Sequence, residues 1–359
     1  MNNSKNVLNY IFGNGSFIQL KEVIDKQRKV SSGDVLYFVD EYFKDKKLKN
    51  QIPSENNDSV VFVNTETEID TDLIDKLTTD AKSHHGEKLA IIVGIGGGSI
   101  LDVAKAVSNL YTNGGRAEDY QGWDLVRIPG IYKIGIPTLA GTGAEASRTC
   151  VMMNRKKNLK LGMNSEHTIY DQLIMDPDLT ITVPRDQYFY TGMDTYIHCL
   201  ESLEGSHRHV LADAFSRESL RLCEEIFLSD DMQSDLNREK MMTSSYLGGC
   251  AIANSFVGVV HPFSAGLSVV LDYHHCIANC IVMNHMEEFY PEQTKLFHKM
   301  MDKQKIKLPK GICSGLSDEQ YEKLYLSTII HEKPLKNALG EDFKKILTKE
   351  KVIELFKKM

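Results

Sequence analysis

The segment AIIVGIGGGSILD, residues 90–102, combines an apolar β-branched run, a turn of three glycines and the start of a helical pattern. Short strand-like runs and amphipathic stretches alternate on both sides of it. The predicted strands are 35–39, 60–63, 89–93 and 133–136, and the predicted helices are 69–84 and 99–110. This alternation indicates a parallel β-sheet with crossover helices.

The pattern changes after Pro184, where strand-like runs end and long helical patterns begin, such as 213–227 and 237–251. A chain of 359 residues also exceeds the size at which a single hydrophobic core usually keeps growing. We therefore expect two domains, an α/β domain over residues 1–184 and an all-helical domain over residues 185–359.

The three glycines Gly96, Gly97 and Gly98 would let the backbone approach a pyrophosphate closely. The helix that follows offers unpaired N–H groups and the positive end of its dipole. Ser99 and Asp102 have the spacing of a capping box, which would fix the start of that helix. The strict GxGxxG fingerprint is absent, so a tight strand-to-helix connection without a ligand is an alternative.

A second glycine cluster, PTLAGTGAE at residues 137–145, follows the next predicted strand and offers Thr142 and Glu145 as a second capping box. Two such turns at the carboxyl ends of parallel strands would lie side by side. Asp40 follows the strand 35–39 and is either an acceptor for a ribose hydroxyl or an ordinary loop residue. Together these features predict a site for NAD or NADP in the first domain.

Four side chains in the second domain have spacings that suit a metal site. Asp194 and His198 are four residues apart and share one helix face, about 5 to 6 Å from each other. His261 and His275 would be separated by roughly 21 Å on a straight helix, so they can meet only across a chain break. Spacing alone does not separate His275 from its neighbour His274, nor does it establish that all four residues share one ion.

The break between the two histidines is predicted from Gly266 and from the segment 271–273. One carboxylate oxygen and three imidazole nitrogens suit Fe²⁺ or Zn²⁺ and leave a coordination position open for a substrate oxygen. Such a cation would acidify an alcohol. Cys199 and Cys276 adjoin proposed ligands, but a helical neighbour points about 100° away, so we expect both to be packing residues.

Composition excludes several other classes of function. The formal charge of −7 and the absence of lysine clusters argue against a nucleic-acid partner. The sequence has no run of eighteen apolar residues, so it predicts no membrane span. Residues 1–12 lack the pattern of a secretory signal. Seven cysteines without a CxxC pattern indicate reduced thiols. We therefore expect a cytoplasmic protein.

With these motifs in place, the chain resembles the iron-containing (group III) alcohol dehydrogenase family from residues 12–16 to the terminal helices. The resemblance implies a dehydroquinate-synthase-like fold and a homodimer. It also implies that a GGGS-x-x-D motif holds the dinucleotide pyrophosphate, with a PT-x-x-GTG-x-E segment beside it. The implied cofactor residues are Gly96, Gly97, Gly98, Ser99, Asp102, Thr138, Thr142, Lys160 and Leu179. The implied metal ligands are Asp194, His198, His261 and His275, which selects His275 over His274.

The sequence departs from the family pattern at two positions near these ligands. The family normally carries HxxxH in the third ligand motif, but the second position here is Ala265, so a histidine credited with proton relay or nicotinamide contact is missing. Cys276 replaces the glycine that usually follows the last ligand. The first departure leaves the electron acceptor and the route of proton exit open.

Within the family, residues 120–124, 147–149 and 191–198 look most like the branch that acts on 3-deoxy-D-manno-octulosonate (Kdo). That resemblance implies oxidation of the C8 hydroxyl to an aldehyde, on the way to 8-amino-3,8-dideoxy-Kdo in lipopolysaccharide biosynthesis. Arg148 could pair with the carboxylate of an acidic sugar, but an ordinary salt bridge is the favoured interpretation. The alternatives are a general NAD(P)-dependent alcohol dehydrogenase, a non-redox lyase like dehydroquinate synthase, and a nucleotide- or metal-binding sensor.

Overall fold

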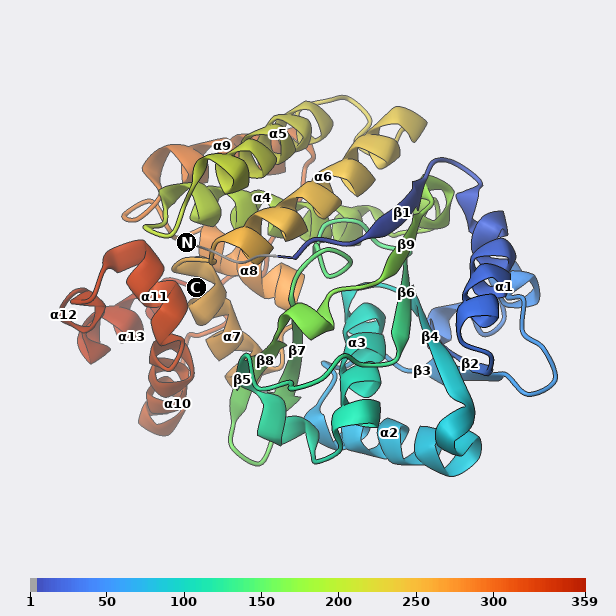
Figure 1. Ribbon diagram of the computed structural model, residues 1–359. Helices are drawn as coiled ribbons and strands as arrows, with labels where there is room; N and C mark the ends of the chain where they lie inside the picture. The colour runs from blue at the N-terminus through green and yellow to red at the C-terminus, as the bar shows by residue number, and fades with distance from the viewer. Residues whose placement is uncertain (1–4) are drawn as a thin grey trace. The chain divides into compact units, whose positions relative to one another are not determined.

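The computed structural model describes residues 5–359. Residues 1–4, which belong to the segment 1–12 that lacks a secretory signal pattern, lie outside the described residues. The chain divides into two compact units (Figure 1). One unit holds the chain up to Lys157 together with Leu161–Thr182, and the other holds Asn158–Lys160 and Val183–Met359. The first unit is α/β and the second is helical, as the sequence predicts.

The first unit is built on a six-stranded sheet with the order β1-β9-β6-β4-β2-β3, in which neighbouring strands are parallel. Its strands are β1 (Asn9–Phe12), β2 (Asp34–Asp40), β3 (Ser59–Val63), β4 (Leu89–Gly96), β6 (Tyr132–Pro137) and β9 (Gln172–Met175). A smaller sheet has the order β5-β8-β7 and consists of β5 (Gly122–Trp123), β7 (Thr149–Asn154) and β8 (Leu159–Asn164).

Strand β4 lies between β2 and β6, and all of its residues are buried. Continuous burial is expected where helices cover both faces of a parallel sheet. Helix α1 (Leu20–Val30) packs through Leu20 and Ile24 on one face, and α3 (Gly98–Asn113) covers the other, as Figure 1 shows. Helix α2 (Thr71–His85) packs beside α3. The four predicted strands and both predicted helices are therefore confirmed.

The second unit consists of helices, and α4 packs against α5, α6 and α8. Its helices are α4 (Arg185–Glu204), α5 (Val210–Phe227), α6 (Asp235–Asn254), α7 (Val260–Leu271), α8 (His275–Met283), α9 (Pro291–Lys303), α10 (Asp318–Ile329), α11 (Glu332–Leu339), α12 (Phe343–Ile346) and α13 (Lys349–Lys357). No helix within residues 5–359 is long and apolar enough to cross a membrane.

Gly192 allows α4 and α5 to pack closely together near Asp194. A methyl group at Gly192 would lie 2.2 Å from the ring of Phe227, a side chain that is fully buried. The contact requires a residue without a side chain at this position. Helix α4 is thereby held firmly two residues before Asp194.

Candidate metal centre

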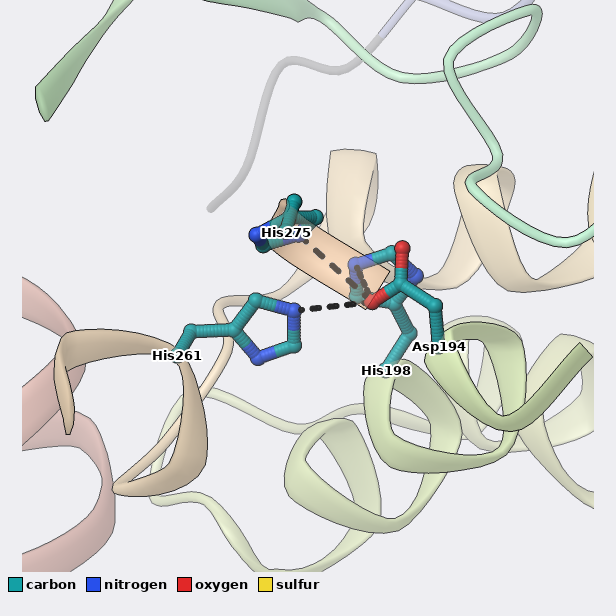
Figure 2. A group of neighbouring side chains, drawn as sticks. All are labelled: Asp194, His198, His261 and His275. Carbon is teal, nitrogen blue, oxygen red and sulfur yellow. Dashed lines mark ion pairs between the residues drawn. The ribbon is translucent and has the colours of Figure 1, made fainter. Parts of the chain in front are cut away.

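Three helices deliver the four predicted ligand residues to one place. Asp194 and His198 lie one turn apart on α4, His261 lies in the first turn of α7, and His275 is the first residue of α8. Figure 2 shows the three imidazoles pointing toward one oxygen of Asp194. Side chains at positions i and i+4 of a helix share a face, so the pair on α4 needs no further device to meet.

The two later ligands meet because the chain turns between α7 and α8. Helix α7 runs through Gly266 and ends at Leu271, and Asp272 follows in the left-handed conformation with a φ of 57°. His274 then precedes the first turn of α8. The predicted break is therefore found at 271–273 rather than at Gly266.

The candidate ligand atoms form a tight group around the Asp194 carboxylate. Its Oδ1 lies 3.6 Å from Nε2 of His198, 3.4 Å from Nε2 of His261 and 3.6 Å from Nε2 of His275. All four ligand atoms lie within 4.8 Å of one another. Two ligand atoms about 2.0 to 2.2 Å from one tetrahedrally coordinated ion lie roughly 3.3 to 3.6 Å apart, which matches the three distances from Oδ1 of Asp194.

Charge and burial act in opposite directions on these groups. Burial raises the pKa of Asp194, but the nearby imidazoles outweigh burial and hold that pKa below its ordinary value. Burial lowers the pKa of His198 to about 4, so this ring is neutral near pH 7. Burial also lowers the pKa of His261, but the carboxylates of Glu201 and Asp194 outweigh it and raise the pKa to about 9.

The donor set fits a divalent cation. Asp194 is fully buried, and a buried carboxylate is costly unless a positive charge compensates it. Its contacts are the three imidazoles, the Asn279 amide at 2.6 Å and the Cys276 thiol at 3.7 Å. Three nitrogens and one oxygen directed at the same point are a combination that Fe²⁺ and Zn²⁺ accept.

The sequence interpretation missed two buried polar residues that support this group. Glu201 accepts hydrogen bonds from Nδ1 of His261 and from the backbone N–H of Val260, both at 2.5 Å. The Asn279 amide donates to Asp194 from α8, one turn after His275. Both residues could have been found from spacing, because Glu201 lies three residues after His198 on α4.

Cys199 and Cys276 are both buried packing residues, as expected, but Cys276 has a further contact. The Cys276 thiol lies 3.7 Å from Oδ2 of Asp194 and so contacts the ligand group. Residue 275 begins α8, and the ligand Asp194 belongs to a different helix. The 100° rule describes directions around one helix axis and does not exclude contact with a neighbouring helix.

The first glycine turn joins β4 to α3 in the first unit. Gly96 ends the strand, Gly97 is the extended N-cap, and Gly98 and Ser99 open the helix. The predicted capping box of Ser99 and Asp102 was wrong, because the helix begins at Gly98. Oδ2 of Asp102 instead accepts from the backbone N–H of Val151 at 2.8 Å.

The second glycine turn lies beside the first, but no helix follows it. Gly141 and Gly143 have φ values of 140° and 63°, which a right-handed helix cannot accommodate, so the second capping box was also wrong. The hydroxyl of Thr142 accepts from Ala144 N within the turn. The backbone N–H of Thr138 donates to Gly96 O at 3.0 Å and ties the two turns together.

The other predicted cofactor residues have different surroundings. Asp40 ends β2, where its carboxylate accepts from Tyr42 N and from the Thr65 hydroxyl, each at 3.0 Å. Leu179 packs against the core of the first unit. The Lys160 ammonium lies 3.2 Å from the Ser268 hydroxyl in the second unit.

Two family models match the chain. The model described as iron-containing alcohol dehydrogenase matches residues 8–177, and the model for the C-terminal part of the Fe-containing alcohol dehydrogenase family matches residues 188–324. The chain belongs to the iron-containing alcohol dehydrogenase family. The matched ranges include every proposed ligand and every proposed dinucleotide residue except Leu179.

Two relatives of this chain are named for different substrates. The NAD-dependent methanol dehydrogenase of Bacillus methanolicus is 31% identical over 221 residues, which is 58% of this chain and 57% of that protein. The sulfoacetaldehyde reductase of Bilophila wadsworthia (strain 3_1_6) is 31% identical over 224 residues, which is 61% of this chain and 56% of that protein. The chain thus spans a little over half the length of either relative.

Solved structures confirm the iron-containing alcohol dehydrogenase fold. A 1,3-propanediol oxidoreductase superposes with a TM-score of 0.85 at 19% identity, covering 99% of both chains. The sulfoacetaldehyde reductase of Bifidobacterium kashiwanohense in complex with NAD+ superposes with a TM-score of 0.80 at 20% identity, covering 99% of this chain and 98% of that one. At these identities the likeness establishes the fold alone.

Proposed function

We propose that this chain is a metal-dependent alcohol dehydrogenase that oxidises a primary alcohol to an aldehyde, with NAD or NADP as the hydride acceptor. The observation that carries the proposal is the convergence of Asp194, His198, His261 and His275 within 4.8 Å. Membership of the iron-containing alcohol dehydrogenase family supports the reaction class. The names of the methanol dehydrogenase and 1,3-propanediol dehydrogenase relatives support a primary alcohol as substrate.

In this proposal each ligand residue has its own task. Asp194 supplies the negative charge, and His198 supplies a neutral ring because burial lowers its pKa to about 4. His261 presents Nε2 to the site while its Nδ1 faces Glu201. A divalent cation held there supplies the Lewis acidity that lowers the pKa of an alcohol hydroxyl. The dinucleotide turns of the first unit hold the pyrophosphate of the group that accepts the hydride.

The decisive test compares two adjacent histidines. His275→Ala removes one of four ligands, so the purified variant should lose both bound metal and turnover. His274→Ala is the matched control, because His274 is exposed and should leave both properties intact. Metal content is measured on anaerobically purified protein, and turnover is measured as NAD reduction with Fe²⁺ or Zn²⁺ added. Full activity in metal-free His275→Ala protein would refute the mechanism.

The narrower proposal is that the substrate is Kdo, oxidised at its C8 hydroxyl. It is supported by the likeness of residues 120–124, 147–149 and 191–198 to that branch of the family. Arg148 forms an ion pair with Asp124, so an acidic sugar would have to compete with this carboxylate. Assays with Kdo, methanol and 1,3-propanediol decide the matter, because turnover of the simple alcohols without turnover of Kdo would exclude it.

We further propose that the protein is a cytoplasmic homodimer. Its seven cysteines are all buried thiols, which fits a reducing compartment. Strand β1 forms one edge of the described sheet, and Tyr10 and Phe12 on this strand are exposed. Apolar side chains on an edge strand are usually covered in a functional assembly. A second copy of the chain is the partner that this proposal assigns.

A further inference from the structure

A buried carboxylate stands behind one of the candidate ligands. Glu201 lies on α4 with an exposed fraction of 1%, seven residues after Asp194 and three after His198. A glutamate in this position cannot reach water, so its charge must be satisfied by the protein. The hydrogen-bond partners of Glu201 therefore indicate its role.

The two oxygens of Glu201 have different partners on α7. Oε1 accepts from the backbone N–H of Val260, and Oε2 accepts from Nδ1 of His261, both at 2.5 Å. Val260 is the first residue of α7, where backbone N–H groups have no partner within the helix. One oxygen thus caps α7, while the other holds the ring of the ligand in its next residue.

Further groups fix the carboxylate itself. The Tyr290 hydroxyl accepts from the backbone N–H of Val259 at 3.1 Å, just before α7. A methyl group at Gly258 would lie 2.5 Å from the Tyr290 hydroxyl and 3.1 Å from Oε1 of Glu201. The segment before α7 therefore packs directly onto the acid, and Glu201 has little freedom to turn away from His261.

This contact determines which nitrogen of His261 carries a proton. A carboxylate only accepts hydrogen bonds, so Nδ1 must be the protonated nitrogen of a singly protonated ring. The lone pair then resides on Nε2, the atom that lies 3.4 Å from Oδ1 of Asp194. Ligand histidines in metal sites usually have their second nitrogen held in this way.

We propose that Glu201 is a positioning residue that fixes the tautomer and orientation of His261 and thereby sets the affinity of the site for its cation. The inference rests on the proposed metal centre and assigns no contact between Glu201 and the cation. Glutamine at this position has nearly the same shape but carries one donor and one acceptor. Whichever way the amide turns, one of its N–H groups faces either Nδ1–H of His261 or the Val260 N–H.

The test is the metal affinity of Glu201→Gln, measured with Zn²⁺ in competition with a chelator. Loss of a group that orients a ligand typically weakens binding by roughly ten- to a hundredfold. The visible spectrum of the Co²⁺ form should change as well, because the ligand field depends on how His261 is held. Glu204→Gln is the matched control, since Glu204 lies one turn further along α4 and is exposed.

Glu201→Asp is the second variant and carries the test if Glu201→Gln does not fold. It keeps the charge but shortens the side chain, so its affinity should lie between those of the wild type and Glu201→Gln. Wild-type affinity and spectrum in either variant would overturn the inference while leaving the metal centre intact. Failure of the wild-type protein itself to bind any divalent ion would instead refute the proposed function and this inference with it.

Discussion

A side chain at Gly98, in the first glycine turn, would meet Thr142 of the second turn. A methyl group there would lie 2.9 Å from the hydroxyl oxygen of Thr142 and 3.1 Å from its methyl carbon. Gly98→Ala should therefore push the two turns apart at a cost of about 1 to 3 kcal/mol. We expect NAD affinity to fall about tenfold, which corresponds to 1.4 kcal/mol.

The measurement is a titration of NADH fluorescence, with bound metal determined in parallel and expected to be unchanged. Ser83→Ala, on the exposed side of α2 in the same unit, is the control and should bind NADH normally. Unaltered binding by Gly98→Ala would mean that the dinucleotide does not depend on the spacing of these turns.

Residue types could be predicted from the sequence more securely than their partners. The four candidate ligands were chosen from spacing and resemblance, and the structure brings them together. Asp102, in contrast, was expected to cap its own helix but accepts from Val151, which is forty-nine residues away. Glu201 was overlooked for the same reason, since its partner His261 is sixty residues away. Contacts over such distances depend on helix packing, which no local pattern specifies.

The connection between α7 and α8 makes a second prediction, at the scale of these two helices. Asp272 has a φ of 57°, a conformation that asparagine and aspartate tolerate and β-branched residues avoid. Asp272→Val should cost about 1 to 2 kcal/mol and weaken metal binding, because the turn that aligns His261 with His275 becomes strained. Thermal unfolding of the metal-free protein and Zn²⁺ affinity are the measurements.

Asp272→Asn is the companion variant and should behave like the wild type, since it keeps the left-handed preference. Equal stability and affinity in the valine and asparagine variants would show that this backbone conformation does not matter to the site.

Elements with a strong periodic pattern were predictable, and very short strands were not. The runs 35–39 and 60–63 correspond closely to β2 and β3. Strands β1 and β9 have four residues each, and β1 is mostly exposed, so neither shows a long buried run. The pairing of β1 with β9 joins the beginning and end of the first unit. Such long-range pairing gives no local signal.

At the scale of the whole molecule, composition and texture predicted an α/β unit followed by a helical one. The structure also assigns Asn158–Lys160 to the helical unit, so the division is not a single point in the sequence. The hydrogen bond from Lys160 to Ser268 explains part of this assignment, because it links residues 108 positions apart. The change of sequence pattern after Pro184 does not indicate that residues 158–160 belong to the helical unit.

Assembly is the property of the whole molecule that the exposed edge of the sheet allows us to test. Side chains alternate along a strand, so Tyr10 and Phe12 project from the same face of β1, where they are 59% and 36% exposed. Replacing both with lysine adds two charges per copy to the proposed contact, and burying unpaired charges is costly. We expect the double variant to sediment as a monomer where the wild type sediments as a dimer.

Val210→Lys is the control, because Val210 is 88% exposed but belongs to the helical unit. A double variant that remains dimeric would place the interface elsewhere, whereas a wild-type monomer at every concentration would exclude the dimer altogether.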